Sequence, residues 1–304
     1  MFTASKRSHK LRHLIFSVLV LALSERAALA CPDINGLLDI NCDGQVRIVC
    51  FGDSITYGTA DSTGLGYPGN LKQLHPGVVV LNVGDPGEKT PQGKVRAAQI
   101  FAQENHADFI VILEGVNDYW LFYSANNTKN NLINMINSGN NTDAVVLLAK
   151  LTQVKRAFQQ PWVNSVNSAI SGLTQVDFFS LGQGIISSDL LHPDAEGYSE
   201  MADFLSAILI QQTELNRPAD LDQDGIYDFA EPSFNTSAAL ADTDGDGLLD
   251  GQEVFIYHSD PNVVDTDGDG MDDGFEVNTV GSDPASNLPT PAIIQSIEAL
   301  PSEL

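Results

Sequence analysis

The chain has 304 residues, with 40 Asp and Glu against 15 Lys and Arg, which gives a formal net charge of −25. Half of the acidic residues, 20 in number, lie between Pro218 and Leu304, where there is no Lys or Arg. Because no segment forms a basic face, nucleic acid is not expected as a partner, and the length suits one large domain with a smaller one.

Residues 1–30 have the pattern of a signal peptide. Basic residues at positions 6–12 precede an apolar run from Leu14 to Leu23, and the small-residue site Ala28-Leu29-Ala30 follows. The run is too short to span a bilayer, so we expect a secreted, periplasmic or cell-surface protein without a transmembrane span in the mature chain. Cleavage would leave Cys31 first and allow its lipidation, but the bulky Leu29 favours ordinary secretion.

The mature chain would keep three cysteines, Cys31, Cys42 and Cys50. An exported protein can form disulfides, and an odd number of cysteines leaves one over. Cys50 lies in an apolar run and suits a buried small side chain, which favours a Cys31–Cys42 pair. Lipidation of Cys31 would instead favour a Cys42–Cys50 pair.

Short apolar runs alternate with longer segments of helical spacing, which is typical of an α/β domain whose parallel sheet is covered on both faces. The spacing predicts helices at 92–104, 162–173 and 194–212. This pattern ends at Arg217-Pro218, so the α/β domain is expected over residues 31–215. The five runs predicted as strands are Val46–Phe51, Val78–Val83, Phe109–Leu113, Ala144–Leu148 and Val176–Ser180.

Polar stretches follow the first three predicted strands, at the sheet edge where active sites collect. Ser54 stands in a Gly-Asp-Ser turn, where a serine can be exposed for attack with its N–H at a helix start. Gly87 could bring its N–H close to a substrate because it has no side chain. Asn117 could donate its side-chain amide. Each residue taken alone also fits an ordinary turn or cap.

Asp189 and His192 stand three residues apart in the stretch "SSDLLHPDAEGY". A carboxylate that bonds an imidazole fixes the tautomer and orientation of the ring, as a serine nucleophile requires of its base. A second His-Pro pair, His75-Pro76, has Lys72 where the aspartate would stand. We therefore expect His75 to be a turn residue.

Four motifs, in their order along residues 46–212, resemble those of the SGNH (GDSL-type) hydrolase family. They are Gly52-Asp53-Ser54, Gly87 within Asn-x-Gly-x-x-Gly, Gly115-x-Asn117-Asp118, and Asp189-x-x-His192-Pro193.

The resemblance implies a flavodoxin-like three-layer α/β sandwich and a carboxylic ester hydrolase. It also implies that Ser54 is the nucleophile, His192 the general base and acid, and Asp189 the residue that orients His192. The oxyanion hole would consist of the Ser54 and Gly87 N–H groups and the Asn117 side chain, with no cofactor for catalysis.

The stretch "GDSITYG" is more similar to the carbohydrate-esterase members of this family, which implies short acyl esters, such as acetyl groups on a polysaccharide. Trp120, Phe122 and Tyr123 could stack on a sugar, line an acyl pocket or be buried in the core. The alternatives are a lipase or lysophospholipase-type esterase and an acyltransferase of the same family. A calcium-dependent surface-binding (adhesion) protein with a non-catalytic hydrolase domain is a third alternative.

The acidic segment repeats a calcium-loop pattern three times over residues 216–284, with oxygen side chains at positions 1, 3, 5, 9 and 12. Glycine at position 6 allows the sharp turn, and position 7 contributes a backbone carbonyl. The predicted ligands are Asp220, Asp222, Asp224, Ile226, Asp228 and Glu231; Asp242, Asp244, Asp246, Leu248, Asp250 and Glu253; and Asp265, Asp267, Asp269, Met271, Asp273 and Glu276.

The period of this segment and its Ser-Asp-Pro stretches resemble bacterial thrombospondin type 3 repeats, which implies structural Ca²⁺. Asp260 and Asp283 could add ligands or simply form turns before proline. Incomplete runs at 33–39 and 41–43 are expected to be turns. Residues 285–304 have no assigned role, and the partner of the tail is unknown.

Overall fold

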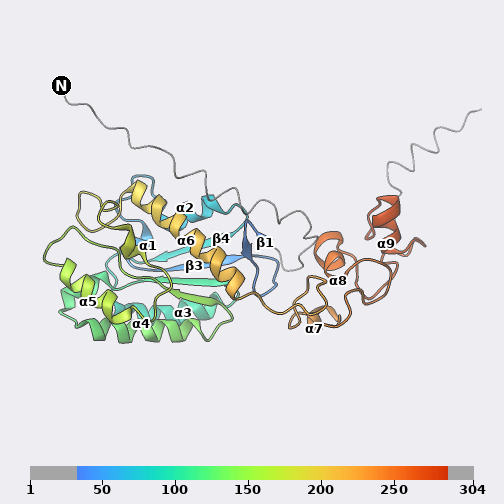
Figure 1. The fold of residues 1–304 in the computed structure, drawn as a ribbon, viewed down its shortest axis with the longest axis horizontal. Helices are drawn as coiled ribbons and strands as arrows, with labels where there is room; N and C mark the ends of the chain where they lie inside the picture. Colours follow the sequence, from blue (N-terminus) through green and yellow to red (C-terminus); the bar gives the residue numbers. More distant parts are fainter. Residues whose placement is uncertain (1–32, 287–304) are drawn as a thin grey trace, which may run out of the picture.

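The computed structural model describes residues 33–286, which form an α/β domain followed by an extended series of acidic loops (Figure 1). The predicted signal peptide and Cys31 lie outside the described residues, as does most of the unassigned segment 285–304. Within residues 33–286, no helix combines the length and hydropathy that crossing a bilayer requires.

The centre of the α/β domain is a parallel sheet of four strands, β3 (Arg47–Gly52), β4 (Val79–Gly84), β5 (Phe109–Leu113) and β6 (Val145–Leu148). Their order is β4-β3-β5-β6, which is the order of a flavodoxin-like sheet. The carboxyl ends of β4, β3 and β5 are level, because Gly52 pairs with both Gly84 and Leu113. Four of the five predicted strands and the predicted fold class are therefore confirmed.

The fifth predicted strand, Val176–Ser180, is wrong beyond its first residue. Val176 forms a single parallel bridge to Ala149, and the chain then enters the 3-10 helix η2 (Phe178–Leu181). The Asp177 side chain causes this turn, because it accepts the N–H of Ser180 at 3.2 Å and holds the Lys150 ammonium at 2.6 Å. A local side-chain cap thus competes successfully with the strand ladder.

Helices cover both faces of the sheet (Figure 1). On one face, α2 (Gly66–Leu74) packs against α6 (Ala195–Leu215), and on the other α4 (Ala125–Gly139) packs against both α3 (Thr90–Gln103) and α5 (Gln160–Ile170). The three predicted helices are confirmed within a few residues. Proline in the first turn helps to begin α3 and α5, because it needs no N–H partner there.

Burial of the sheet on both faces explains why its strands read as unbroken apolar runs. Every residue of β5 is buried, and β3 is buried from Ile48 to Gly52. Aromatic side chains fill the space beneath the helices, including Phe51 and Phe101, whose ring centroids lie 5.3 Å apart. This rigid core carries the loops at the carboxyl ends of the strands.

Two short strands, β1 (Asp33–Ile34) and β2 (Leu37–Leu38), form a hairpin before the sheet. Cys42, in the loop that follows, is disulfide-bonded, and Cys50 in β3 is a free, buried thiol. The alternative Cys42–Cys50 pair is therefore excluded. The other half of the predicted Cys31–Cys42 pair lies outside the described residues.

The helices of the acidic segment are all short, and a single antiparallel bridge joins Ser237 to Leu240. These helices are α7 (Glu231–Phe234), α8 (Asp250–Gln252), η3 (Glu253–Tyr257), α9 (Asp273–Phe275) and η4 (Glu276–Val280). Ile226 and Ala230 are the buried centre of a small apolar cluster there, whereas Tyr227 belongs to the core of the α/β domain. The first acidic loop is therefore anchored on that domain.

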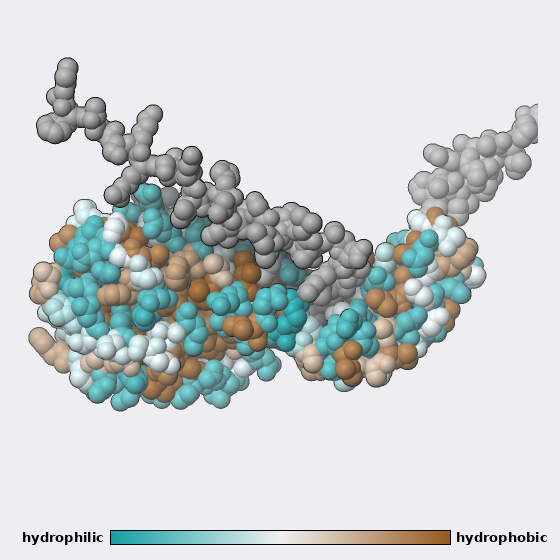
Figure 2. Space-filling model, in the orientation of Figure 1, coloured by the Kyte–Doolittle hydropathy of each residue, from teal (hydrophilic) through white to brown (hydrophobic). Residues whose placement is uncertain are grey.

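Apolar side chains of the acidic segment remain partly exposed, and Figure 2 shows brown residues scattered among teal ones on its visible face. Leu240 is 51% exposed and Phe275 is 49% exposed. So little apolar burial gives the segment a weak hydrophobic core.

Candidate active site and acidic loops

The candidate nucleophile, Ser54, is the first residue of helix α1 (Ser54–Tyr57), directly after β3. Asp53 caps this helix by accepting the N–H of Ile55 at 3.0 Å. Ser54 is 6% exposed, so its hydroxyl is almost enclosed by the domain. The strand and the cap together fix where the hydroxyl lies.

Tertiary structure brings Ser54 and His192 together across 138 positions of sequence. The His192 Nε2 atom lies 2.8 Å from the Ser54 Oγ atom, and His192 Nδ1 lies 2.5 Å from the Asp189 Oδ2 atom. This is the order of contacts in which an imidazole can take a proton from a hydroxyl while a carboxylate orients the ring.

Asp189 is held by several donors besides the imidazole. Its Oδ1 atom accepts the Leu191 and His192 N–H groups at 2.9 Å and the Ser187 hydroxyl at 2.9 Å. Burial alone would raise the pKa of Asp189, but hydrogen bonds from His192, Leu191 and Ser187 hold it well below its usual value. Asp189 is therefore ionised across the physiological range.

The three predicted oxyanion donors lie at the ends of neighbouring strands. Within the described residues, the N–H groups of Ser54 and Gly87 form no hydrogen bond to protein. Asn117 lies in the 3-10 helix η1 (Val116–Leu121), and one N–H of its amide donates to the Glu88 carbonyl at 2.9 Å. The second N–H of that amide remains free for a ligand.

The buried Asp118 ties two of these loops together, a role that the sequence motif did not reveal. Its carboxylate accepts the N–H and the hydroxyl of Thr90, at 2.9 and 2.5 Å, and the hydroxyl of Thr128 at 2.7 Å. Thr90 begins α3, so Asp118 fixes the loop after β4 relative to η1. A satisfied buried network of this kind makes the loops rigid.

The second His-Pro pair lies outside this site, as expected. His75 ends α2, is 3% exposed, and contacts Ser206 through its Nε2 atom at 2.8 Å. Burial lowers the pKa of His75.

Aromatic side chains form an exposed surface beside the site. Tyr119 contacts three other rings, with centroids 5.2 Å away at Trp120, 5.8 Å at Phe158 and 6.0 Å at Trp162. Trp120 is 54% exposed, Phe158 is 59% exposed, and Phe122 is 94% exposed. We refer to Tyr119, Trp120, Phe122, Phe158 and Trp162 as the aromatic surface.

The aromatic surface is joined to the loop of the candidate base. The Lys155 N–H donates to the Leu190 carbonyl at 3.0 Å, so the segment before Phe158 packs on the loop that carries Asp189 and His192. Tyr123, in contrast, contributes its carbonyl to the Trp162 indole at 3.0 Å. Of the alternatives, burial in the core is therefore excluded for Trp120 and Phe122, which are both exposed.

Each acidic loop gathers its first three carboxylates, as the calcium pattern requires. Ligand oxygens within 4.8 Å of one another come from positions 1, 3 and 5 of every loop. The groups are Asp220, Asp222 and Asp224; Asp242, Asp244 and Asp246; and Asp265, Asp267 and Asp269. The position 6 glycines have φ between 95° and 99°, which is the left-handed turn that the loop needs.

Two further carboxylate groups join consecutive loops, which the sequence pattern did not predict. Positions 5 and 12 of one loop meet position 9 of the next loop within the same 4.8 Å limit. We call these the boundary clusters. They are Asp224, Glu231 and Asp250, and Asp246, Glu253 and Asp273.

The boundary clusters contain buried oxygens without any hydrogen-bond partner among the described residues. These atoms include Asp224 Oδ2, Glu231 Oε1, Glu253 Oε2 and Asp273 Oδ2. Burial and neighbouring carboxylates raise the pKa of Asp224 to about 7 and that of Glu253 to about 8. Such clustering is unfavourable unless a cation or protons offset the charge.

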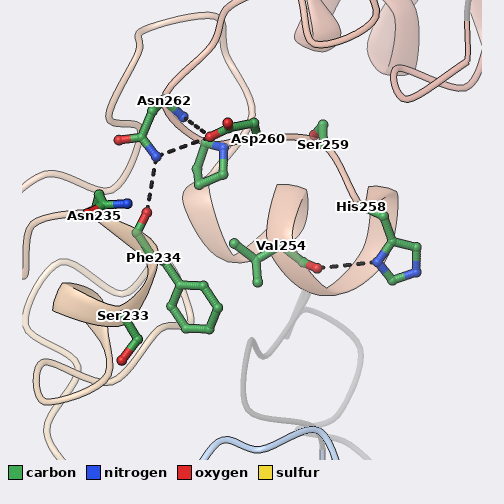
Figure 3. A pocket seen from close by; sticks show the side chains of 9 residues that line it. Ser233, Phe234, Asn235, Val254, His258, Ser259, Asp260 and Asn262 are labelled. Atoms are coloured by element: carbon green, nitrogen blue, oxygen red, sulfur yellow. Dashed lines mark hydrogen bonds between the residues drawn. The ribbon is translucent and has the colours of Figure 1, made fainter.

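Asp260 and Asp283 each accept a backbone N–H within a turn. Asp260 Oδ1 accepts the N–H of Asn262 at 3.1 Å beside a cleft between α7 and η3 (Figure 3). Asp283 Oδ1 accepts the N–H of Ala285 at 3.1 Å. The run at 41–43 is a turn as predicted, in which Asn41 Oδ1 accepts the N–H of Asp43 at 3.0 Å. The run at 33–39, predicted as a turn only, instead contains the two short strands of the β1–β2 hairpin.

Comparison with known proteins reveals two matching families. Residues 50–199 match the model of the GDSL-like Lipase/Acylhydrolase family, and residues 242–263 and 265–287 match the bacterial TSP3 repeat. The first acidic loop, at 220–231, lies outside the matched repeats. No curated protein matches the chain at a significant level.

Among solved structures, the chain is similar to a member of the lipolytic protein G-D-S-L family from Veillonella parvula DSM 2008. The identity is 23%, the match covers 52% of this chain and 94% of that chain, and the TM-score is 0.47. The psychrotrophic esterase EstA from Pseudoalteromonas sp. matches with 17% identity, coverage of 55% and 98%, and a TM-score of 0.46. By the family matches, residues 50–199 are a GDSL-like lipase/acylhydrolase domain, the domain of a carboxylic ester hydrolase, and bacterial TSP3 repeats follow it.

Proposed function

We propose that the α/β domain hydrolyses esters through a Ser54-His192-Asp189 triad. The observation that carries this proposal is the continuous chain of contacts from the Ser54 hydroxyl through both ring nitrogens of His192 to Asp189, at 2.8 and 2.5 Å. His192 Nε2 takes the hydroxyl proton while Ser54 Oγ forms a bond to the acyl carbon.

The negative charge that develops on the carbonyl oxygen meets the free donors of Ser54, Gly87 and Asn117. The imidazolium then gives its proton to the leaving alkoxide, which departs as an alcohol and leaves an acyl group on Ser54. In the second half, His192 takes a proton from water, the hydroxide attacks the acyl carbon, and the acid leaves as Ser54 regains its proton. Asp189 stabilises the imidazolium throughout.

The second serine–histidine contact of the chain provides a matched control for this mechanism. Ser54→Ala and His192→Ala should each lower kcat for p-nitrophenyl acetate on the order of 10³-fold or more, since triad members act as a unit. Ser206→Ala and His75→Ala remove a contact of the same 2.8 Å length and should leave kcat nearly unchanged. Full activity in Ser54→Ala would overturn the mechanism.

For the substrate, we infer a short acyl ester on a carbohydrate, because the aromatic surface offers exposed rings beside the triad. Sugar rings pack their C–H faces on aromatic rings, whereas a long acyl chain needs an enclosed apolar channel. Trp120→Ala and Phe158→Ala should raise KM for acetylated polysaccharide several-fold and leave p-nitrophenyl acetate hydrolysis unchanged.

Phe275→Ala removes a similarly exposed ring in the acidic segment and is the control for nonspecific effects. Rising activity along a series of p-nitrophenyl esters of increasing chain length would instead support the lipase alternative. Faster transfer to an added alcohol than to water would support the acyltransferase alternative.

We also propose that residues 216–284 bind structural Ca²⁺, with the boundary clusters as shared sites. The residues fit a hard cation, because every group offers carboxylate oxygens and several of these are buried without a partner. Bound Ca²⁺ would supply the positive charge that these groups lack. The aspartate at position 9, Asp250 or Asp273, would then bind the ion in the boundary cluster that it shares with the preceding loop, rather than an ion within its own loop.

Position 9 offers a matched comparison for the shared sites. Asp228 and Asp250 each accept the N–H of the second residue of their own loop, at 2.8 and 2.7 Å, but only Asp250 also belongs to a boundary cluster. Asp250→Asn should therefore weaken calcium binding by about tenfold in calorimetry, while Asp228→Asn should have a much smaller effect. Equal effects of the two variants would contradict shared sites.

We further infer export of the chain, with residues 31–215 as the hydrolase domain and 216–284 as the calcium repeats. Support comes from the signal-peptide pattern of residues 1–30 and from the disulfide at Cys42, which suits an oxidising compartment. Helix α6 ends at Leu215, at the proposed limit. Mass spectrometry of the mature protein would reveal the cleavage site.

A further inference from the structure

An arginine of helix α3 contacts the ends of the two strands that precede Ser54 and Gly87. Arg96 donates to the Val83 carbonyl at the end of β4, at 2.7 Å, and to the Gly52 carbonyl at the end of β3, at 3.1 Å. Its guanidinium also lies over the Phe51 ring, 4.1 Å from the centroid. The Gly52 carbonyl is two residues before Ser54.

Arg96 also holds the side chain of Glu88. The Arg96 Nε atom lies 2.9 Å from Glu88 Oε1 and 3.1 Å from Glu88 Oε2. The Arg96 Nη2 atom also donates to Glu88 Oε2, so the two side chains form an ion pair. Glu88 follows Gly87 directly, and its own carbonyl accepts the amide of Asn117 at 2.9 Å. One ion pair therefore connects the strand before Ser54, the residue after Gly87 and the anchor of Asn117.

The pair lies in a buried acidic surrounding where a charged Glu88 needs its partner. Glu88 is 8% exposed, and nearby Asp53 and Glu114 are each 1% exposed. Neither oxygen of Glu114 has a hydrogen-bond partner among the described residues. Loss of Arg96 would leave Glu88 as an unpaired buried charge, which is strongly unfavourable or forces the side chain to move.

We propose that Arg96, acting through Glu88, is a positioning residue that sets the geometry of the three oxyanion donors. This inference rests on the proposed triad mechanism. Among the described residues, no hydrogen bond or ion pair joins Arg96 to Ser54, so Arg96 would act through other residues. It fixes the loop after β4, so that the Gly87 N–H and the Asn117 amide point to the same place as the Ser54 N–H.

The proposal predicts a kinetic signature that simple loss of stability would not produce. Oxyanion donors stabilise the transition state more than the bound ester, so their misplacement should lower kcat and leave KM nearly constant. Displacement of one donor costs on the order of 10²-fold in kcat. A purely structural arginine would change the melting temperature and the active fraction, but not kcat per titrated active site.

The experiment compares full-length wild type with Arg96→Met, Arg96→Lys and Glu88→Gln on p-nitrophenyl acetate, with active sites titrated by a p-nitrophenyl phosphonate. Arg96→Met should lower kcat on the order of 10²-fold, with KM within about threefold. Arg96→Lys should recover part of that loss, because an ammonium can pair with Glu88 but cannot reach both strand carbonyls as well. Arg47→Met, at the opposite end of β3, is the matched control and should match wild type.

A folded Arg96→Met variant with wild-type kcat, or with unchanged kcat and a raised KM, would overturn the proposal. If Arg96→Met does not fold by circular dichroism, Glu88→Gln decides, because it keeps the side-chain volume and removes only the charge. A Glu88→Gln kcat within about twofold of wild type would then overturn it. Failure of the triad mechanism itself would show separately, as undiminished activity in Ser54→Ala.

Discussion

The two ring nitrogens of His192 have different partners, and this difference decides which proton the ring carries. The ionised Asp189 accepts from Nδ1, so the neutral ring has its proton on Nδ1 and a free lone pair on Nε2 toward Ser54. The proposed base therefore has the required tautomer before substrate binds.

Asp189→Asn tests that tautomer. An amide can donate to Nδ1 and thereby stabilise the other tautomer, whose protonated Nε2 cannot act as a base. We expect kcat near neutral pH to fall on the order of 10⁴-fold with little change in KM. Steady-state kinetics on a short-chain ester provide the measurement, and a loss of less than about tenfold would show that Asp189 does not set the tautomer.

Asp53 should make the stability of the α/β domain depend on pH. Burial raises its pKa to about 7, although the N–H groups of Ile55, Gly115 and Val116 donate to it. In the unfolded chain the pKa is about 3.9, so between those values the folded state binds more protons. The free energy of unfolding should therefore fall as pH rises from about 4 to about 7.

Asp53→Asn should remove this contribution, which amounts to at most ~1.4 kcal/mol per pH unit. Urea unfolding of both proteins at several pH values, with calcium present, would measure the difference in slope. Asp143→Asn, at an exposed position, is the control. Parallel pH profiles for wild type and Asp53→Asn would contradict the assignment.

At the scale of elements, the close contact between β3 and β5 depends on a glycine at the end of β3. A Cβ atom at Gly52 would overlap the Leu113 carbonyl oxygen and the Thr56 hydroxyl. Because Gly52 pairs with both neighbouring strands, neither strand can move away without loss of the sheet edge that carries Ser54.

Gly52→Ala should therefore destabilise the protein by ~3 kcal/mol or more through overpacking against backbone. Gly172→Ala is the matched control, because a Cβ there would have no atom within 4 Å and should be neutral or slightly stabilising. Chemical denaturation of both variants would provide the comparison. Equal stability of the two would mean that the strand ends are more adaptable than their contacts suggest.

At the scale of the whole molecule, the proposed triad and the acidic loops are separate along the chain. Ser54, Asp189 and His192 all precede the end of α6 at Leu215. The repeats reach the α/β domain through Tyr227 and through packing of Ile226 near Cys42. The acidic loops beyond that junction have little apolar burial to hold them without a cation.

Chelation of calcium should therefore open the repeats and leave the hydrolase active. We expect a protease to cut within residues 232–284 in the presence of chelator, while kcat for a small soluble ester stays within about twofold of the calcium-loaded value. Gel analysis and a p-nitrophenyl acetate assay on the same samples would show both effects. Repeats that resist the protease equally with chelator, or loss of hydrolysis, would contradict this separation.

The sequence by itself determined the class of fold, the resemblance to a hydrolase family, the candidate triad and the acidic loops. These features could be predicted because each depends on residues close together in the sequence. Unbroken apolar runs indicate buried parallel strands, a serine in a glycine-containing turn after a strand indicates a nucleophile, and alternating carboxylates around a glycine indicate a calcium loop. The fifth strand was predicted wrongly, and the cause is again local. The Asp177 side chain caps a turn, and a pattern of apolar residues does not reveal such a cap.

Only the tertiary structure decided which distant residues act together. Arg96 carries no motif, and its position beneath Gly52, Val83 and Glu88 follows from the packing of α3 against the strand ends. Asp250 reads as a ligand of its own loop, yet the fold places it with Asp224 and Glu231. Spacing along a chain specifies neighbours within one turn or loop, whereas contacts between elements depend on how their faces pack.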